Sequence, residues 1–94
     1  MIRTSALTGA TATIRTGKCV LRGILMVADT GTEPILTVYN NTAAAGTDIK
    51  AFLMPSDEQH TVFVWFGEGL SCSLGIHAVL SAATADYIVY YEIK

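Results

Sequence analysis

The run HTVFVWFG, which begins at His60, limits the possible folds of this chain more than any other stretch. Its residues are mostly β-branched or aromatic, which favours a strand, and successive side chains of a strand point to opposite faces. The two faces of the predicted strand are Val62, Val64 and Phe66 on one side and Phe63 and Trp65 on the other. Both faces are therefore apolar, although a sheet with one face in water needs only one.

The rest of the chain also has the pattern of short strands. No window places apolar residues at i, i+3, i+4 and i+7 between helix caps, and turn residues such as Gly31, Pro34, Gly67 and Gly69 separate the apolar runs. The predicted strands are residues 10–15, 18–28, 35–40, 47–54, 61–67, 74–81 and 86–93, with an extra strand near 3–7. This spacing, without helices between the strands, predicts an all-β fold: a single small antiparallel β-sandwich or jelly-roll-like domain of seven to eight short strands. The domain is predicted to span residues 1–94, with residues 1–9 as an extended N-terminal arm.

Two more predicted strands have two apolar faces. In CVLRGILMV, strict alternation sets Leu21, Leu25 and Val27 against Val20, Ile24 and Met26, with Arg22 as the one charge. In the last strand it sets Tyr87, Val89, Tyr91 and Ile93 against Ile88 and Tyr90. One small core cannot cover so much apolar surface, and a monomer that exposed it would be prone to aggregate. We therefore expect a homo-oligomer, and the residues predicted for its subunit interface are Trp65, Phe66, Tyr90 and Tyr91.

Charged residues are few and nearly balanced. They make up 15% of the chain, against about 25% in typical soluble domains, and the net charge is −2. The basic residues are separated along the chain, which argues against a nucleic-acid partner because phosphate binding needs clustered cations. The longest charge-free run is 17 residues, 69–85, and it is too short and too polar to cross a membrane. The N-terminal segment lacks the apolar core of a secretory signal.

The candidate reactive residues are two cysteines and two histidines. Cys72 and His77 are five positions apart and would point to opposite faces of one strand, whereas a nucleophilic cysteine needs its base within hydrogen-bond reach. Tertiary contacts could still bring His60 or His77 to either cysteine. Together with Cys19 these residues are zinc-ligand types, but the short paired spacings of structural zinc sites are missing.

We therefore expect no catalytic residues, no metal and no cofactor, and we expect the chain not to be an enzyme. Cys19 and Cys72 are expected to pack as small hydrophobic side chains, and their redox state stays open. The role of His77 is also open, because it shares a face with Val79 and could lie at the rim of a subunit contact.

Three segments, taken in order, resemble a known family. They are SALTGATATIRTGKCVLRGILM, then LTVYNNTAAAGTDIKAFL, and finally FGEGLSCSLGIHAVLSAATADYIVYYE. In the first, a small-residue strand runs into a strand that contains a cysteine. In the second, a strand ends in an aromatic residue and Asn, and GT begins the next strand. The third has a GL turn, a GIHAVLS strand and a terminal VYY. This order resembles the small β-sandwich virion proteins of tailed bacteriophages that decorate or cement capsids.

The resemblance covers nearly the whole chain and rests on structural glycines and apolar strands. It implies a non-enzymatic structural protein of the virion, assembled in the host cytoplasm, which forms a trimer and clamps neighbouring major capsid subunits. It implies no catalytic or cofactor residues, and it leaves a tail or fibre position open. The alternative is a lectin-like or receptor-binding module of a phage tail or fibre, in which Trp65 and tyrosines near the loops bind a sugar.

Overall fold

The computed structural model describes residues 1–43, 48–55 and 60–94. All regular elements in these ranges are strands, and no helix in them is long and apolar enough to cross a membrane. The strands are β1 (Arg3–Thr4), β2 (Ala12–Thr16), β3 (Cys19–Ala28), β4 (Leu36–Tyr39), β5 (Ile49–Leu53), β6 (Thr61–Cys72), β7 (Gly75–Leu80) and β8 (Ala85–Ile93). They form two four-stranded antiparallel sheets that pack as a sandwich, which confirms the predicted fold class.

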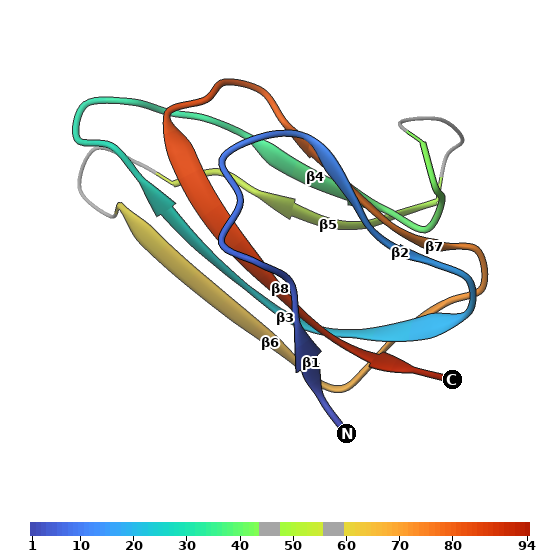
Figure 1. Ribbon diagram of the computed structural model, residues 1–94. Coiled ribbons are helices and arrows are strands. Elements are labelled where there is room, and N and C mark those ends of the chain that lie inside the picture. The colour runs from blue at the N-terminus through green and yellow to red at the C-terminus, as the bar shows by residue number, and fades with distance from the viewer. Residues whose placement is uncertain (44–47, 56–59) are drawn as a thin grey trace.

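The strands pair in nested order, as if the chain were folded in half. β4 pairs with β5 in the middle of the chain, then β3 with β6, β2 with β7, and β1 with β8. Two further pairs, β3 with β8 and β4 with β7, give sheets of order β1-β8-β3-β6 and β2-β7-β4-β5 (Figure 1). A nested antiparallel ribbon rolled into two sheets is the jelly-roll arrangement.

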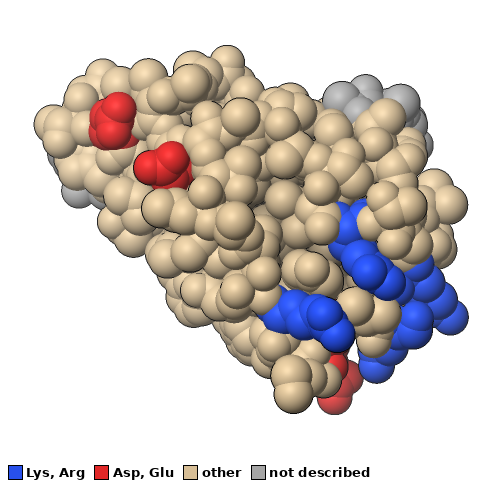
Figure 2. Space-filling model, in the orientation of Figure 1, with Lys and Arg blue, Asp and Glu red and all other residues tan. Residues whose placement is uncertain are grey.

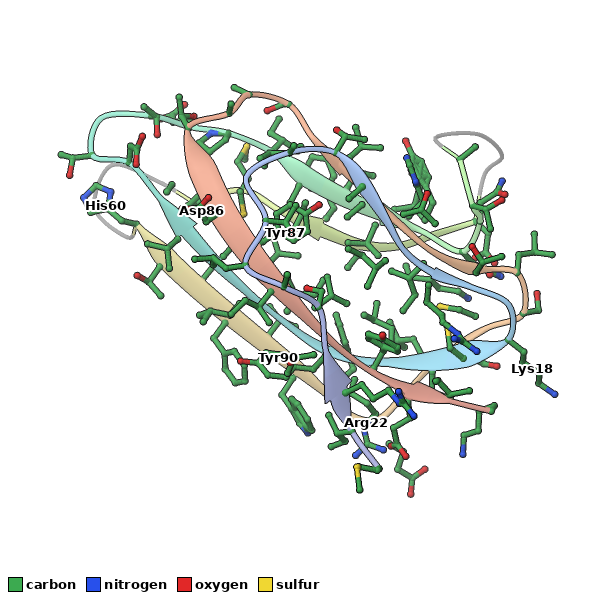
Figure 3. The ribbon with its side chains drawn as sticks, viewed as in Figure 1. Lys18, Arg22, His60, Asp86, Tyr87 and Tyr90 are labelled. Atoms are coloured by element: carbon green, nitrogen blue, oxygen red, sulfur yellow. The ribbon has the colours of Figure 1, made fainter. Side chains whose placement is uncertain are left out.

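The core lies between the two sheets and takes one face of most strands. The apolar residues with no exposed surface are Cys19, Leu21, Ile24, Met26, Leu36, Val38, Cys72, Ile76, Ala78, Tyr87 and Val89. Tyr87 is the largest of them, and Figure 3 shows it between the sheets. Its hydroxyl donates a hydrogen bond to the Ala10 carbonyl at 2.6 Å, so the buried polar atom is satisfied by the backbone that leads into β2.

A β-bulge at Arg22 reverses the predicted faces of β3. Leu21 and Gly23 pair with consecutive residues of β8, so Arg22 is one extra residue on β3. Beyond the bulge the buried side chains are Ile24 and Met26, and the outward ones are Leu25 and Val27. The prediction that grouped Leu21 with Leu25 and Val27 was wrong, because strict alternation does not allow for an inserted residue.

β6 is longer than predicted, because the GEG sequence is a bulge within the strand and not a turn. Gly67 and Gly69 have φ of 63° and 98°, a region that side chains disfavour, yet the strand continues to Cys72. Residues 66–69 bulge opposite the single extra residue of β3. A Cβ atom on Gly69 would run into the Val20 side chain, so the bulge requires glycine there. The turn into β7 comes later, at residues 73–74.

The other predicted strands end within two residues of the observed ones, apart from the strand near 3–7. Thr47, the first residue of the strand predicted at 47–54, lies outside the described residues. The strand near 3–7 is regular only over Arg3–Thr4, but the segment continues along β8: the Ser5 N–H donates to the Val89 carbonyl at 2.8 Å, and the Thr8 N–H to the Tyr87 carbonyl at 3.0 Å. The N-terminal segment therefore covers the edge of β8.

Candidate functional site

The outward surface of the β1-β8-β3-β6 sheet carries a cluster of apolar side chains. They come from three adjacent strands, in rows that the register aligns: Trp65, Gly23 and Tyr90 in one row, and Phe63, Leu25 and Ile88 in the next. We name the cluster the aromatic face and define it as Leu25, Val27, Phe63, Trp65, Ile88 and Tyr90. Phe63 is 57% exposed, and Trp65 and Val27 are each 44% exposed. A contiguous exposed apolar patch of this kind makes the surface a candidate for an interaction site.

The three rings of the aromatic face contact one another. The Phe63 and Trp65 centroids are 6.3 Å apart with an interplanar angle of 25°, so these rings are stacked. Tyr90 meets both edge-on, at 6.2 Å from Phe63 and 6.1 Å from Trp65. These are favoured aromatic geometries, and the rings stand on paired strands, so the fold itself holds the three rings in place.

Gly23 makes room for the platform. A Cβ atom at this position would lie 2.6 Å from Cε3 of Trp65 and 2.8 Å from the Val64 carbonyl oxygen. The indole can therefore lie over β3, between its own strand and Tyr90, only because this residue has no side chain. The single glycine joins the aromatic residues of β6 to those of β8.

Arg22 forms a polar border at one end of the aromatic face. Its guanidinium carbon is 5.5 Å from the centroid of the Trp65 ring, and its Nη1 is 2.6 Å from Oε1 of Glu92. Figure 3 shows Arg22 and Tyr90 on the outer side of the sheet, away from the interior that holds Tyr87. A cation over an indole is worth about 0.5–1 kcal/mol at an exposed site. The contact therefore helps to orient the indole.

The structure divides the four residues predicted for the interface. Trp65 and Tyr90 lie together on the aromatic face. Phe66 and Tyr91 are half-buried and pack against the core from the inner side of the same strands, and their part in a subunit contact stays a prediction. Phe63 was missing from the predicted set, although strand alternation already places it on the same face as Trp65.

The structure brings the two cysteines together but places both histidines elsewhere. Cys72 lies in the core opposite Cys19, with both thiols free, and burial raises the pKa of Cys72 to about 11. His77 faces outward on the other sheet, where its Nδ1 is 2.9 Å from Oγ1 of Thr13. His60 precedes β6, whereas Cys72 ends it (Figure 3). In the part of the chain that the structure describes, no three His, Cys, Asp or Glu residues are close enough to hold a metal ion, and no pocket is found.

Basic side chains that are separated in the sequence gather at one end of the sandwich (Figure 2). The Lys94 N–H donates to the Lys18 carbonyl at 3.3 Å, and Arg3 pairs with Tyr91 next to the strand that carries Arg22. This basic end comprises Arg3, Arg15, Lys18, Arg22 and Lys94, and it also contains Glu92, which is paired with Arg22. Separation along the chain therefore does not mean separation in space, and the exclusion of a nucleic-acid partner stays a prediction.

Comparisons of this chain with known proteins find no match. No family model matches the chain. No curated protein matches it, and no solved structure does. What is established is a small all-β sandwich of two four-stranded sheets with an exposed aromatic face.

Proposed function

We propose that this chain is a non-enzymatic structural protein that self-associates through the outward surface of its β1-β8-β3-β6 sheet. The observation that carries the proposal is the aromatic face, where three rings lie 6.1 to 6.3 Å apart and those of Phe63 and Trp65 are exposed. Subunit interfaces are enriched in aromatic residues, and burying apolar surface contributes about 25 cal/mol per Å². A domain with a small core gains stability when that surface is covered.

The assembly in which we place the protein is the capsid of a tailed bacteriophage. There it would act as a decoration or cement protein that clamps neighbouring major capsid subunits, as a component of a virion built in the host cytoplasm. The order of the three sequence segments supports this, as does the jelly roll, an architecture that capsid domains use. The jelly roll supports the proposal only by analogy, because one fold serves many functions.

Two measurements test the proposal: the mass of the protein in solution by light scattering, and its co-sedimentation with capsid shells that lack it. We expect an oligomer that binds the shells. Tyr90→Asp would bury a carboxylate in the contact and is expected to release smaller species or to cause aggregation. The matched control is Thr37→Asp, on the outward surface of the other sheet, which should keep the wild-type mass.

An unchanged mass for Tyr90→Asp would remove β8 from the interface. A wild-type protein that is monomeric and has no affinity for the shells would overturn the proposal as a whole.

The second candidate function is a lectin-like or receptor-binding module, and the surroundings of Trp65 favour it. The exposed indole stands beside the guanidinium of Arg22, which is paired with Glu92. An aromatic platform bordered by hydrogen-bonding groups is the surface on which sugar rings stack. Binding on a glycan array that is lost in a folded Trp65→Ala variant would favour this function, and a blank array would reject it.

A further inference from the structure

The outer edge of β6 has no paired strand among the described residues. β6 is the last strand in the order β1-β8-β3-β6, and Figure 1 shows it at the rim of the sheet. Its first half, Thr61–Phe66, contains no charge, no proline and no glycine. Natural edge strands are usually protected by such residues or by a covering segment, and an edge without them is a template for another strand.

The other edges of the sandwich have that protection. The opposite edge of the same sheet is β1, a strand of only two residues that contains Arg3, and residues 3–8 cover β8 with backbone hydrogen bonds. The edge strands of the second sheet are β2, which contains Arg15, and β5, which contains Lys50. Charges on an edge strand disfavour pairing with another chain. The first half of β6 therefore differs from every other edge in the described part of the molecule.

The register shows which backbone groups of β6 face outward. The Ala28 N–H donates to the His60 carbonyl at 2.8 Å, so the even-numbered residues of this stretch turn their N–H and C=O toward β3. Antiparallel ladders alternate, so the odd-numbered residues turn theirs away from β3. The donors and acceptors of Thr61, Phe63 and Trp65 thus point to the free edge, and two of these residues belong to the aromatic face.

We propose that β6 pairs with β6 of a second copy of this chain, antiparallel and about a two-fold axis, so that the two sheets become one sheet of twice the width. The inference rests on the self-association in the proposed function and adds an edge contact along β6, which leaves the outward aromatic face free for the contact proposed there. A two-fold axis at Phe63 pairs Phe63 with its counterpart, and Thr61 with Trp65 of the second copy. Each of these pairs can exchange two backbone hydrogen bonds.

The second copy is the occupant that fits because the edge is self-complementary. Directly opposed residues of an antiparallel pair share a face, so this register joins the two aromatic faces into one surface with a Phe63 ring from each copy at its centre. Thr61–Phe66 has no charged residue, so the pairing places no charge next to an apolar side chain of the second copy. The bulge at Gly67 and Gly69 ends the regular edge, and each copy has one such edge, so the contact closes at two chains.

The test compares Phe63→Pro with Phe63→Ala by light scattering. Both variants remove the ring, but only proline removes the edge-facing N–H, which β3 does not use. We expect Phe63→Ala to keep the wild-type mass at high concentration and Phe63→Pro to fall to half of it, because only proline breaks the edge contact. A Phe63→Pro variant that keeps the wild-type mass would overturn the edge pairing.

A measurement on the unaltered protein covers the case in which Phe63→Pro does not fold. Amide hydrogen exchange followed by NMR should show the N–H groups of Thr61, Phe63 and Trp65 protected at high concentration and exchanging at least tenfold faster on dilution. An oligomer in which these three amides exchange freely, or a trimer such as the resemblance implies, would overturn the edge pairing but keep self-association. A monomer at every concentration would overturn both. Protection that appears only when capsid shells are added would assign the edge to a capsid segment and reject the second copy.

Discussion

Gly23 shows how one residue can shape a surface that it does not itself form. A glycine within a strand normally weakens it, because it adds backbone freedom and has no side chain to pack. Here the missing side chain is replaced by the Trp65 indole, which lies where the Cβ atom would be. The cost in strand stability is thereby offset by contact between rings from two strands that are not neighbours, β6 and β8.

The prediction at this residue is that Gly23→Ala displaces the indole. Because the new methyl group would meet both Trp65 and the Val64 carbonyl, we expect a loss of about 1–3 kcal/mol in the free energy of unfolding. Trp65 is the only tryptophan, so its emission should shift to the red as the ring moves into water. Urea denaturation and fluorescence spectra measure the two effects.

Gly17→Ala is the matched control for Gly23→Ala. It also loses stability, since Gly17 has φ of 102°, but no atom lies within 4 Å of its added methyl group. Its emission should stay as in the wild type. An unshifted Trp65 emission in Gly23→Ala would show that the indole does not rest on β3.

At the scale of elements, Asn40 ties the loop after β4 to the turn between β6 and β7. It is the one buried polar side chain among the described residues. Its Nδ2 donates to Oδ2 of Asp48 at 2.8 Å, and its Oδ1 accepts the Leu74 N–H at 2.9 Å. The hydrogen bond from Asn40, followed by that from Lys50, lowers the pKa of the Asp48 carboxyl.

We predict that Asn40→Leu destabilises the fold by about 1–3 kcal/mol at neutral pH, because it leaves the Leu74 N–H without its acceptor. The lowered pKa of Asp48 adds a pH dependence of known sign. The folded state favours the carboxylate, so this stabilisation is present above the ordinary carboxyl pKa of about 4 and is lost as the pH falls through the lower, folded value. The gap between wild type and Asn40→Leu should therefore be larger at pH 7 than at pH 3.

Urea titrations at the two pH values measure this gap. Ser73→Ala, which removes only a 3.3 Å contact to the same amide, is the control and should cost little. A gap that does not change with pH would mean that Asn40 does not act on Asp48.

The strands themselves could be predicted from local pattern, while their pairing could not. Alternation assigned both faces of residues 61–66 correctly, because this stretch has no inserted residue. It failed in β3 after Arg22, because a bulge is fixed by the partner strands and not by the residues of the strand alone. Likewise Gly67 and Gly69 suit a turn as well as a bulge, since both use positive φ. The sequence therefore predicts Trp65 and Tyr90 as interface residues but not that β3 brings them together.

For contacts with charged partners, the distribution of charge over the whole molecule matters more than its net charge. β3 and β8 run between the two ends of the sandwich: Cys19 and Ile93 pair at the basic end, while Ala28 and Ala85 pair at the other. Figure 2 shows Lys and Arg gathered at the first end, with an acidic group beside them, and only acidic groups at the second. Charges are screened beyond a Debye length, which is about 10 Å at 0.1 M salt. A charged partner that approaches one end therefore interacts with the charges of that end and not with the net charge of the molecule.

We therefore predict that the protein, despite its net charge of −2, is retained on a sulfonate cation exchanger at pH 7 and low salt. Lys18→Glu combined with Lys94→Glu should abolish retention, because both exposed side chains belong to the basic end. Glu33→Gln is the control, since it makes the net charge less negative at the opposite end and should leave the elution salt nearly unchanged. Elution that follows net charge alone, with Glu33→Gln retained more strongly than the wild type, would show that the basic end does not act as a local site. If the protein is retained, the separation of the basic residues along the sequence no longer argues against anionic partners such as nucleic acid. Direct binding measurements would then be needed to test such partners.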